Sequence, residues 1–121
     1  MKILIYIVAI IFLLSGSAKL LSLDFELAAF ERWGYPQYFM YFIGACEVLG
    51  GLALIINFLR KYASLGLTLL MLGAISTHVM HNEWPMVIIA GVILILTVLM
   101  AGSLWNQKEP IKQSPDSEEV D

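Results

Sequence analysis

Ionisable side chains within apolar stretches are the residues of this sequence best placed to do chemistry. Lys19, Glu47 and His78 each lie in a separate apolar run. Charged groups are costly in hydrocarbon, so residues of this kind are functional-site candidates by default. A carboxylate near a lysine and an imidazole can exchange protons with a ligand or hydrogen-bond its carbonyl group. We therefore predict that these three residues form one intramembrane polar cluster.

Small and hydroxyl-bearing neighbours accompany this predicted cluster. Four supporting residues lie close to the three ionisable positions in sequence: Ser15, Thr77, Gly50 and Gly51. Small residues allow membrane helices to approach closely, and hydroxyl groups form hydrogen bonds between them. The same polar groups are also compatible with a purely structural use, in which they only hold the helices together.

The two histidines and a nearby glutamate are candidate metal ligands. His78 and His81 are three residues apart, and Glu83 follows them. Both histidines share one helix face, so they cannot ligate opposite faces of a single haem. Two histidines and one glutamate are also few ligands for a structural or catalytic zinc site. We therefore predict that the chain has no metal site.

Composition indicates where these side chains must lie. Of the 121 residues, 60% are hydrophobic and 14% are charged, whereas soluble domains carry about 25% charged residues. A short chain cannot bury so much apolar surface in water, so the lipid bilayer must be the solvent for most of it. The net charge of -3 does not suggest binding to nucleic acid. The single cysteine, Cys46, excludes an intrachain disulfide and a thiolate cluster.

Four apolar stretches reach the length of about 20 residues that a membrane-spanning helix needs. They are residues 3–21, 38–59, 62–80 and 85–105. An open sheet would leave its backbone groups unpaired in lipid, so helices are expected. The sequence therefore predicts an all-α, integral membrane four-helix bundle that forms one domain over residues 1–105.

The distribution of basic residues predicts the orientation in the membrane. Five basic residues fall on one side of the predicted spans, namely Lys2, Arg60, Lys61, Lys108 and Lys112. The other side has only Arg32 outside the spans, so the first side is expected to be cytoplasmic. Both termini are then cytoplasmic, and the polar residues 106–121 are interpreted as a disordered cytoplasmic tail.

Two segments near the first span have alternative interpretations. The apolar run after Lys2 also resembles a cleavable signal peptide, but more membrane-like sequence follows it, which favours an uncleaved helix. Between the first two spans, Asp24 is a candidate N-cap for a short helix that ends near Gly34. We interpret this short helix as an interfacial segment or lid.

Several motifs resemble those of one known family of small four-helix membrane proteins. They are SGSAKL at 15–20, WGYP at 33–36, GACEVLGGLAL at 44–54, the run 62–74, and the Thr77-His78 pair. In this order and spacing they resemble the DoxX-like family. The resemblance covers residues 12 to 80 and implies an integral protein of the bacterial cytoplasmic (inner) membrane. It also implies that Lys19, Glu47, Gly50, Gly51 and His78 occupy positions characteristic of the family.

The resemblance suggests a function linked to membrane redox systems. The family takes its name from a membrane subunit associated with terminal quinol oxidase and thiosulfate:quinone oxidoreductase systems. We therefore expect an accessory or quinone-associated subunit, with membrane oxidoreductase subunits as partners and a non-covalently bound quinone. The sequence has no motif for a redox cofactor, which disfavours independent enzyme activity. The alternatives are binding or proton-coupled transport of a small lipophilic molecule, and a purely structural or assembly role. A homo-oligomer is compatible with each hypothesis.

Overall fold

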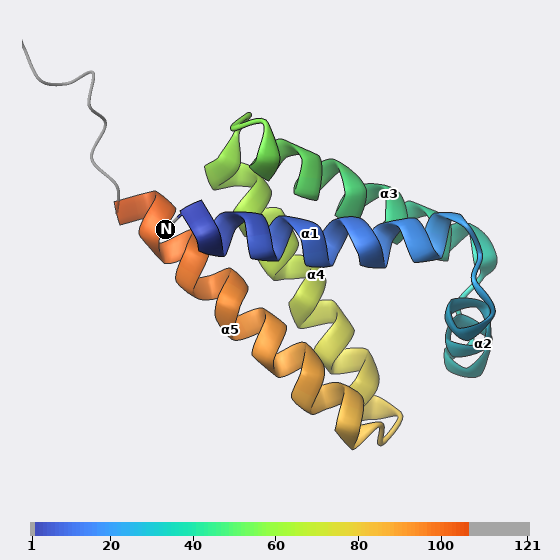
Figure 1. The fold of residues 1–121 in the computed structure, drawn as a ribbon. Coiled ribbons are helices and arrows are strands. Elements are labelled where there is room, and N and C mark those ends of the chain that lie inside the picture. Colours follow the sequence, from blue (N-terminus) through green and yellow to red (C-terminus); the bar gives the residue numbers. More distant parts are fainter. Residues whose placement is uncertain (1, 107–121) are drawn as a thin grey trace, which may run out of the picture.

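The computed structural model describes residues 2–106, and these fold into five helices (Figure 1). The helices are α1 (Lys2–Leu20), α2 (Asp24–Trp33), α3 (Gln37–Ile55), α4 (Arg60–Met80) and α5 (Trp84–Asn106). All except α2 are long and apolar enough to cross a membrane. The predicted all-α membrane fold is therefore confirmed, and the chain is a multi-pass membrane protein. The expected tail at 107–121 lies outside the described residues.

The turn between α3 and α4 lies earlier in the sequence than expected. α3 ends at Ile55 and α4 begins at Arg60, so Arg60 belongs to a helix rather than to the connection. Within the turn, Asn57 and Leu59 both adopt left-handed backbone conformations. Arg60 donates a hydrogen bond from Nε to the carbonyl oxygen of Leu54 at 2.7 Å. Because the last carbonyl groups of a helix lack intrahelical partners, this bond helps to close the end of α3.

The four long helices are arranged as two packed pairs (Figure 1). α1 lies along α3, and α4 lies along α5. The two pairs lie close together near the turn at 56–59 and are farther apart toward the end that carries α2 (Figure 1). The buried core is made of apolar side chains on α1, α3, α4 and α5, including Ile5, Val8, Phe12, Leu54, Leu67 and Met100.

Glycines bring α1 and α3 into close contact. A Cβ atom added to Gly16 would lie 2.6 Å from the carbonyl oxygen of Gly44, so no larger residue fits there without movement. Gly51 packs in the same way against Ala9 and Leu13 of α1. This close approach, which is typical of small residues in membrane helices, places the polar faces of α1 and α3 side by side.

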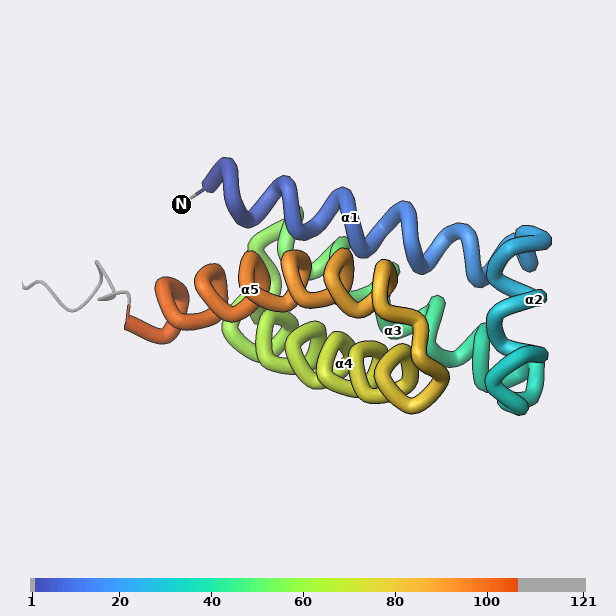
Figure 2. Tube along the Cα trace, turned by 90° about the horizontal axis from the view of Figure 1, so that it is seen from below, coloured from blue at the N-terminus to red at the C-terminus, as the bar shows by residue number. Residues whose placement is uncertain are grey.

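α2 runs across the end of the bundle between α1 and α3 (Figure 2). It ends at Trp33 and is capped by Gly34, whose φ of 81° is a left-handed conformation that glycine adopts easily. The expected N-cap at Asp24 was wrong, because Leu23 occupies that position and makes no capping hydrogen bond with its side chain. Asp24 is instead the first helical residue, where its negative charge still favours the helix.

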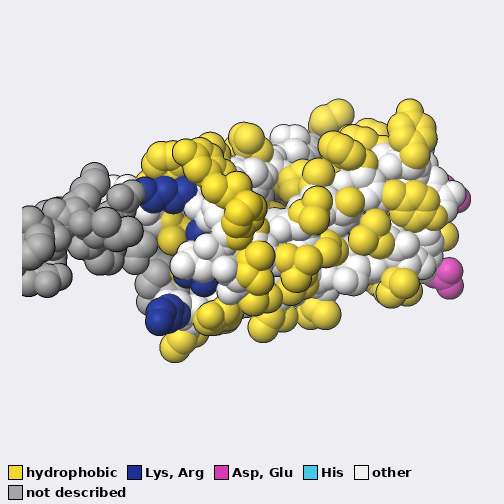
Figure 3. Space-filling view, turned by 90° about the horizontal axis from the view of Figure 1, so that it is seen from above, with side chains coloured by type: hydrophobic (Ala, Val, Ile, Leu, Met, Phe, Trp, Pro, Cys, Tyr) yellow, Lys and Arg dark blue, Asp and Glu magenta, His cyan; other side chains and the backbone are white. Residues whose placement is uncertain are grey.

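The surface has an apolar flank between two charged ends (Figure 3). On the face shown, Lys and Arg side chains gather near one end and acidic side chains near the other. Many large apolar side chains on the long helices are exposed, including Ile10, Leu49, Leu69 and Ile95. Such a surface suits contact with lipid chains rather than with water.

Candidate functional site

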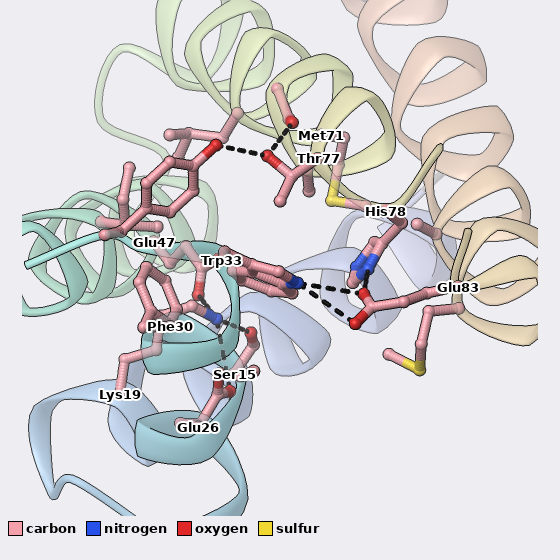
Figure 4. Close-up of a pocket in the computed structure, with 18 of the residues that line it drawn as sticks. Ser15, Lys19, Glu26, Phe30, Trp33, Glu47, Met71, Thr77, His78 and Glu83 are labelled. Carbon is pink, nitrogen blue, oxygen red and sulfur yellow. Dashed lines mark hydrogen bonds and ion pairs between the residues drawn. The ribbon is translucent and has the colours of Figure 1, made fainter. Parts of the chain in front are cut away.

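A cavity of about 730 Å³ lies between the two helix pairs, and residues from all five helices line it (Figure 4). This volume lies within the range of about 300–1,000 Å³ that is typical of small-molecule sites. Its lining is mostly apolar, with side chains such as Phe12, Ile43, Met71, Ile89 and Ile93. Polar groups are concentrated in two clusters on its walls (Figure 4).

The first polar group, which we call the lysine cluster, consists of Lys19, Ser15, Glu26 and Glu47. The ammonium group of Lys19 lies 2.9 Å from Oγ of Ser15. It also lies 3.4 Å from Oε2 of Glu26 and 3.4 Å from Oε2 of Glu47. The side chain of Glu47 is only 8% exposed. A single ammonium group therefore forms ion pairs with two carboxylates, and its three protons face three acceptors.

The second polar group, which we call the histidine cluster, consists of His78, Glu83, Arg32 and Trp33. Nδ1 of His78 lies 2.7 Å from Oε1 of Glu83. Arg32 donates to Oε2 of Glu83 from Nε at 3.0 Å and from Nη2 at 2.7 Å. The indole N–H of Trp33 lies 3.2 Å from each oxygen of the same carboxylate. Glu83 therefore joins α2 to the turn between α4 and α5.

Glu83 is held in its ionised form by these donors. Desolvation by burial acts to raise its pKa, but the hydrogen bonds from His78, Arg32 and Trp33 outweigh that effect. The net result is a pKa lowered from 4.5 to about 2. A carboxylate can only accept hydrogen bonds, so Nδ1 of His78 must be the donor in this pair.

Aromatic side chains close the cavity on the side of α2. Trp33 lies edge-on to the imidazole of His78, with ring centroids 5.3 Å apart. Phe30 lies 5.1 Å from Trp33 and 6.4 Å from Phe39 by the same measure. Tyr35 donates to Oγ1 of Thr77 at 3.1 Å, because that hydroxyl already donates to the carbonyl of Gly73. The end of α2 and the residues that follow it thus form a packed aromatic cover over the cavity.

The structure distributes the residues expected from the sequence over both clusters. Lys19 and Glu47 are paired, and Ser15 lies beside them as expected. His78 lines the same cavity but forms its described side-chain bond with Glu83 instead of either of these residues. Thr77 lines the cavity, whereas Gly50 and Gly51 lie in helix contacts outside its lining.

Sequence reasoning missed four contributors to these clusters, namely Glu26, Arg32, Trp33 and Glu83. Glu26 interrupts the apolar stripe of the short helix, and this interruption was the available signal that it faces inward. Glu83 follows His78 by five residues across a turn, so it can reach back to the imidazole. For Trp33, an interfacial aromatic position was the simplest interpretation. Within residues 2–106, no group of three or more metal-ligating side chains comes together.

Comparison with known proteins places the chain in a family. The model of the DoxX-like family matches residues 3–100. The chain is also 28% identical over 98 residues to "Uncharacterized protein YdgD" of Bacillus subtilis (strain 168), an alignment covering 76% of this chain and 86% of that protein. No solved structure gives a significant match. Because the family match extends over all four long helices, the chain belongs to the DoxX-like family.

Proposed function

We propose that this protein binds a quinone in the cavity, as an accessory subunit of a membrane redox system. The observation that carries the proposal is the pairing of two polar clusters on the walls of an otherwise apolar cavity. A quinone ring has two oxygen atoms at opposite ends of a flat, apolar body. One oxygen can face the lysine cluster and the other the histidine cluster, while the apolar lining contacts the ring.

The flanks of the cavity support a ligand that comes from the bilayer. Leu69 of α4 and Ile89 of α5 both line the cavity, yet their side chains are 62% and 52% exposed. Exposed apolar residues at the edge of a cavity let a lipophilic tail extend into the surrounding lipid chains. A quinone with an isoprenoid or alkyl tail has this combination of a polar ring and an apolar tail.

The proposal divides the redox work between this chain and a partner. Its own residues bind and orient the ring and can exchange protons with it. The quinone would supply the electron-carrying chemistry when bound. Cys46 alone cannot ligate an iron–sulfur cluster, so electrons must be exchanged with an oxidoreductase subunit in the same membrane.

Binding can be measured by the fluorescence of Trp33, which lines the cavity. In a Trp84→Phe and Trp105→Phe background in nanodiscs, an alkyl benzoquinone should quench the remaining tryptophan in a saturable manner. For the corresponding hydroquinone, Glu47→Gln should weaken the quenching by at least about tenfold in affinity, because a hydroxyl group of the ligand loses a charged acceptor. Glu31→Gln is the matched control, since Glu31 is an exposed acidic residue of α2.

Other outcomes would separate the competing functions. Benzoquinone quenching that never saturates, or hydroquinone quenching that is unchanged by Glu47→Gln, would overturn the proposed quinone site. Flux of a lipophilic compound into proteoliposomes, driven by a proton gradient, would favour the transport hypothesis instead. Co-purification from native membranes with an oxidoreductase subunit would support the proposed partner.

A further inference from the structure

The lysine cluster leaves acceptors rather than ammonium protons available to a ligand. The three protons of the Lys19 ammonium group face Ser15, Glu26 and Glu47. In each carboxylate Oε2 is the atom that accepts from Lys19, and the hydroxyl group of Ser15 also donates to Glu47. Each carboxylate oxygen has two lone pairs, so these bonds do not use all the acceptor sites. Both carboxylates line the cavity. A ligand that approaches this wall therefore meets carboxylate oxygens with unused acceptor capacity.

The histidine cluster also offers an acceptor. Nδ1 of His78 donates to the ionised Glu83, so Nε2 carries a lone pair and no proton whenever the imidazole is neutral. Nε2 has no described hydrogen-bond partner. Every fully buried side-chain nitrogen or oxygen among the described residues does have a partner, so Nε2 must adjoin open space. His78 lines the cavity, which supplies that space.

The formal charges agree with this distribution of acceptors. Three acidic side chains line the cavity, from Glu26, Glu47 and Glu83, against two basic side chains, Lys19 and Arg32. The balance is one negative charge when His78 is neutral. An electron-rich carbonyl oxygen is repelled by such walls, whereas a hydroxyl proton is attracted by them.

On the basis of the proposed function, we propose that the cavity binds the reduced, dihydroxy form of a quinone in preference to the oxidised form. One hydroxyl group donates its proton to a carboxylate oxygen of Glu47 or Glu26. The other donates to Nε2 of His78. The oxidised ring has no protons to donate, so it leaves these acceptors unpaired and places its carbonyl oxygens against them.

This preference has a thermodynamic consequence for the bound ligand. A site that binds the reduced form more tightly makes the bound quinone easier to reduce. For a two-electron couple, each tenfold preference raises the midpoint potential of the bound form by about 30 mV. We expect a preference of at least about tenfold, which corresponds to one well-formed hydrogen bond to a charged acceptor.

The test compares one alkyl benzoquinone with its own hydroquinone, which differ only in two hydrogen atoms. Binding to the full chain in nanodiscs is measured by calorimetry, with empty nanodiscs subtracted. The buffer is anaerobic and mildly alkaline, so that imidazole is neutral. The hydroquinone should bind at least about tenfold more tightly than the quinone. Equal affinity, or tighter binding of the quinone, overturns the inference while the proposed quinone site stands. Absence of binding by both forms overturns the proposed function itself.

A substitution at Glu47 tests the atomic basis of the preference. Glu47→Gln replaces an acceptor by a side chain that can also donate, so the preference should shrink, chiefly through weaker binding of the hydroquinone. Glu31→Gln should leave the ratio of affinities unchanged. An unchanged ratio in Glu47→Gln would overturn the assignment. If that variant does not fold, the comparison of the two ligands on the wild-type protein still decides the matter.

Discussion

His78 and Glu83 close the turn between α4 and α5, with Nδ1 of the imidazole 2.7 Å from Oε1 of the carboxylate. The backbone N–H of Glu83 also donates to the carbonyl oxygen of His78 at 2.9 Å. The same carboxylate accepts hydrogen bonds from Arg32 and Trp33 of α2. These hydrogen bonds therefore hold α2, which covers the cavity, against a turn that lies 50 residues further along the chain.

Glu83→Gln should loosen α2 and destabilise the fold. A neutral amide cannot replace a carboxylate that accepts from three side chains, and hydrogen bonds to charged groups contribute about 1.5–3 kcal/mol each. We expect a loss of that size in the free energy of unfolding, measured in detergent. Hydrogen exchange should increase mainly in residues 24–33. Glu31→Gln is the control. Equal hydrogen exchange of residues 24–33 in both variants would contradict the prediction that Glu83 holds α2 in place.

The same carboxylate should give the stability of the protein a recognisable pH dependence. The pKa of Glu83 is lowered from 4.5 to about 2 in the folded protein. Its contribution is therefore complete above pH 4.5 and is lost as the pH falls toward 2. Over this window the wild-type protein should lose more stability than Glu83→Gln, which has no proton to bind there. Thermal unfolding at a series of acidic pH values measures both curves, and parallel curves would contradict the prediction.

Lys19 and Glu47 should be energetically coupled, but unequally. Lys19→Met leaves both Glu26 and Glu47 without their cation, whereas Glu47→Gln leaves Lys19 paired with Glu26. Removing the partner of a buried charge costs on the order of 3–5 kcal/mol. We therefore expect the larger loss of stability in Lys19→Met, measured by thermal unfolding in detergent.

The double variant completes this comparison. Lys19→Met together with Glu47→Gln should lose less stability than the sum of the two single variants, because only Glu26 then remains unpaired. Strict additivity would mean that the two side chains do not interact in the membrane protein.

The sequence was sufficient for those features that depend on local chemistry. Four apolar runs of membrane-spanning length could become only helices in lipid, which predicted the fold class. Lys19 and Glu47 were noticeable because charges are rare in such runs. The small residues around Gly16 and Gly44 are compatible with the close packing that brings these two charges together.

The remaining parts of the site depend on how the helices are placed relative to one another. The periodicity of apolar residues in the sequence does not predict that placement. The direction of α2 is set by residues 21–23, where Ser22 adopts a left-handed conformation with φ of 55°. That turn decides whether Glu26 faces Lys19 or water. The pairing of Arg32 with Glu83 likewise depends on how far the two helix pairs diverge, and helical periodicity carries no information on this distance.

The orientation of the bundle can be tested by labelling cysteines in a Cys46→Ala background. Lys2, Arg60 and Lys61 lie at the same end of the bundle, and cytoplasmic loops are enriched in basic residues. Phe58→Cys, in the turn at 56–59, should react with a charged maleimide only after the membrane is permeabilised. Asp24→Cys, exposed at the start of α2, should react in intact cells. The reverse pattern would invert the predicted topology.

Gly16→Ala should separate α1 from α3 and weaken the lysine cluster. The new methyl group would lie 2.6 Å from a backbone oxygen of Gly44, so the helices must move apart. Overpacking of this kind costs about 1–3 kcal/mol. Gly66→Ala is the matched control, because a Cβ atom there would meet no described atom within 4 Å.

The two glycine variants should therefore have different effects on stability. Alanine favours a helix over glycine by about 1 kcal/mol, so Gly66→Ala should leave the melting temperature unchanged or raise it, whereas Gly16→Ala should lower it. The coupling between Lys19 and Glu47, measured again in the Gly16→Ala background, should also decrease, because their distance is set by this helix contact. A lower melting temperature with undiminished coupling would show that the contact stabilises the bundle without positioning the two charges.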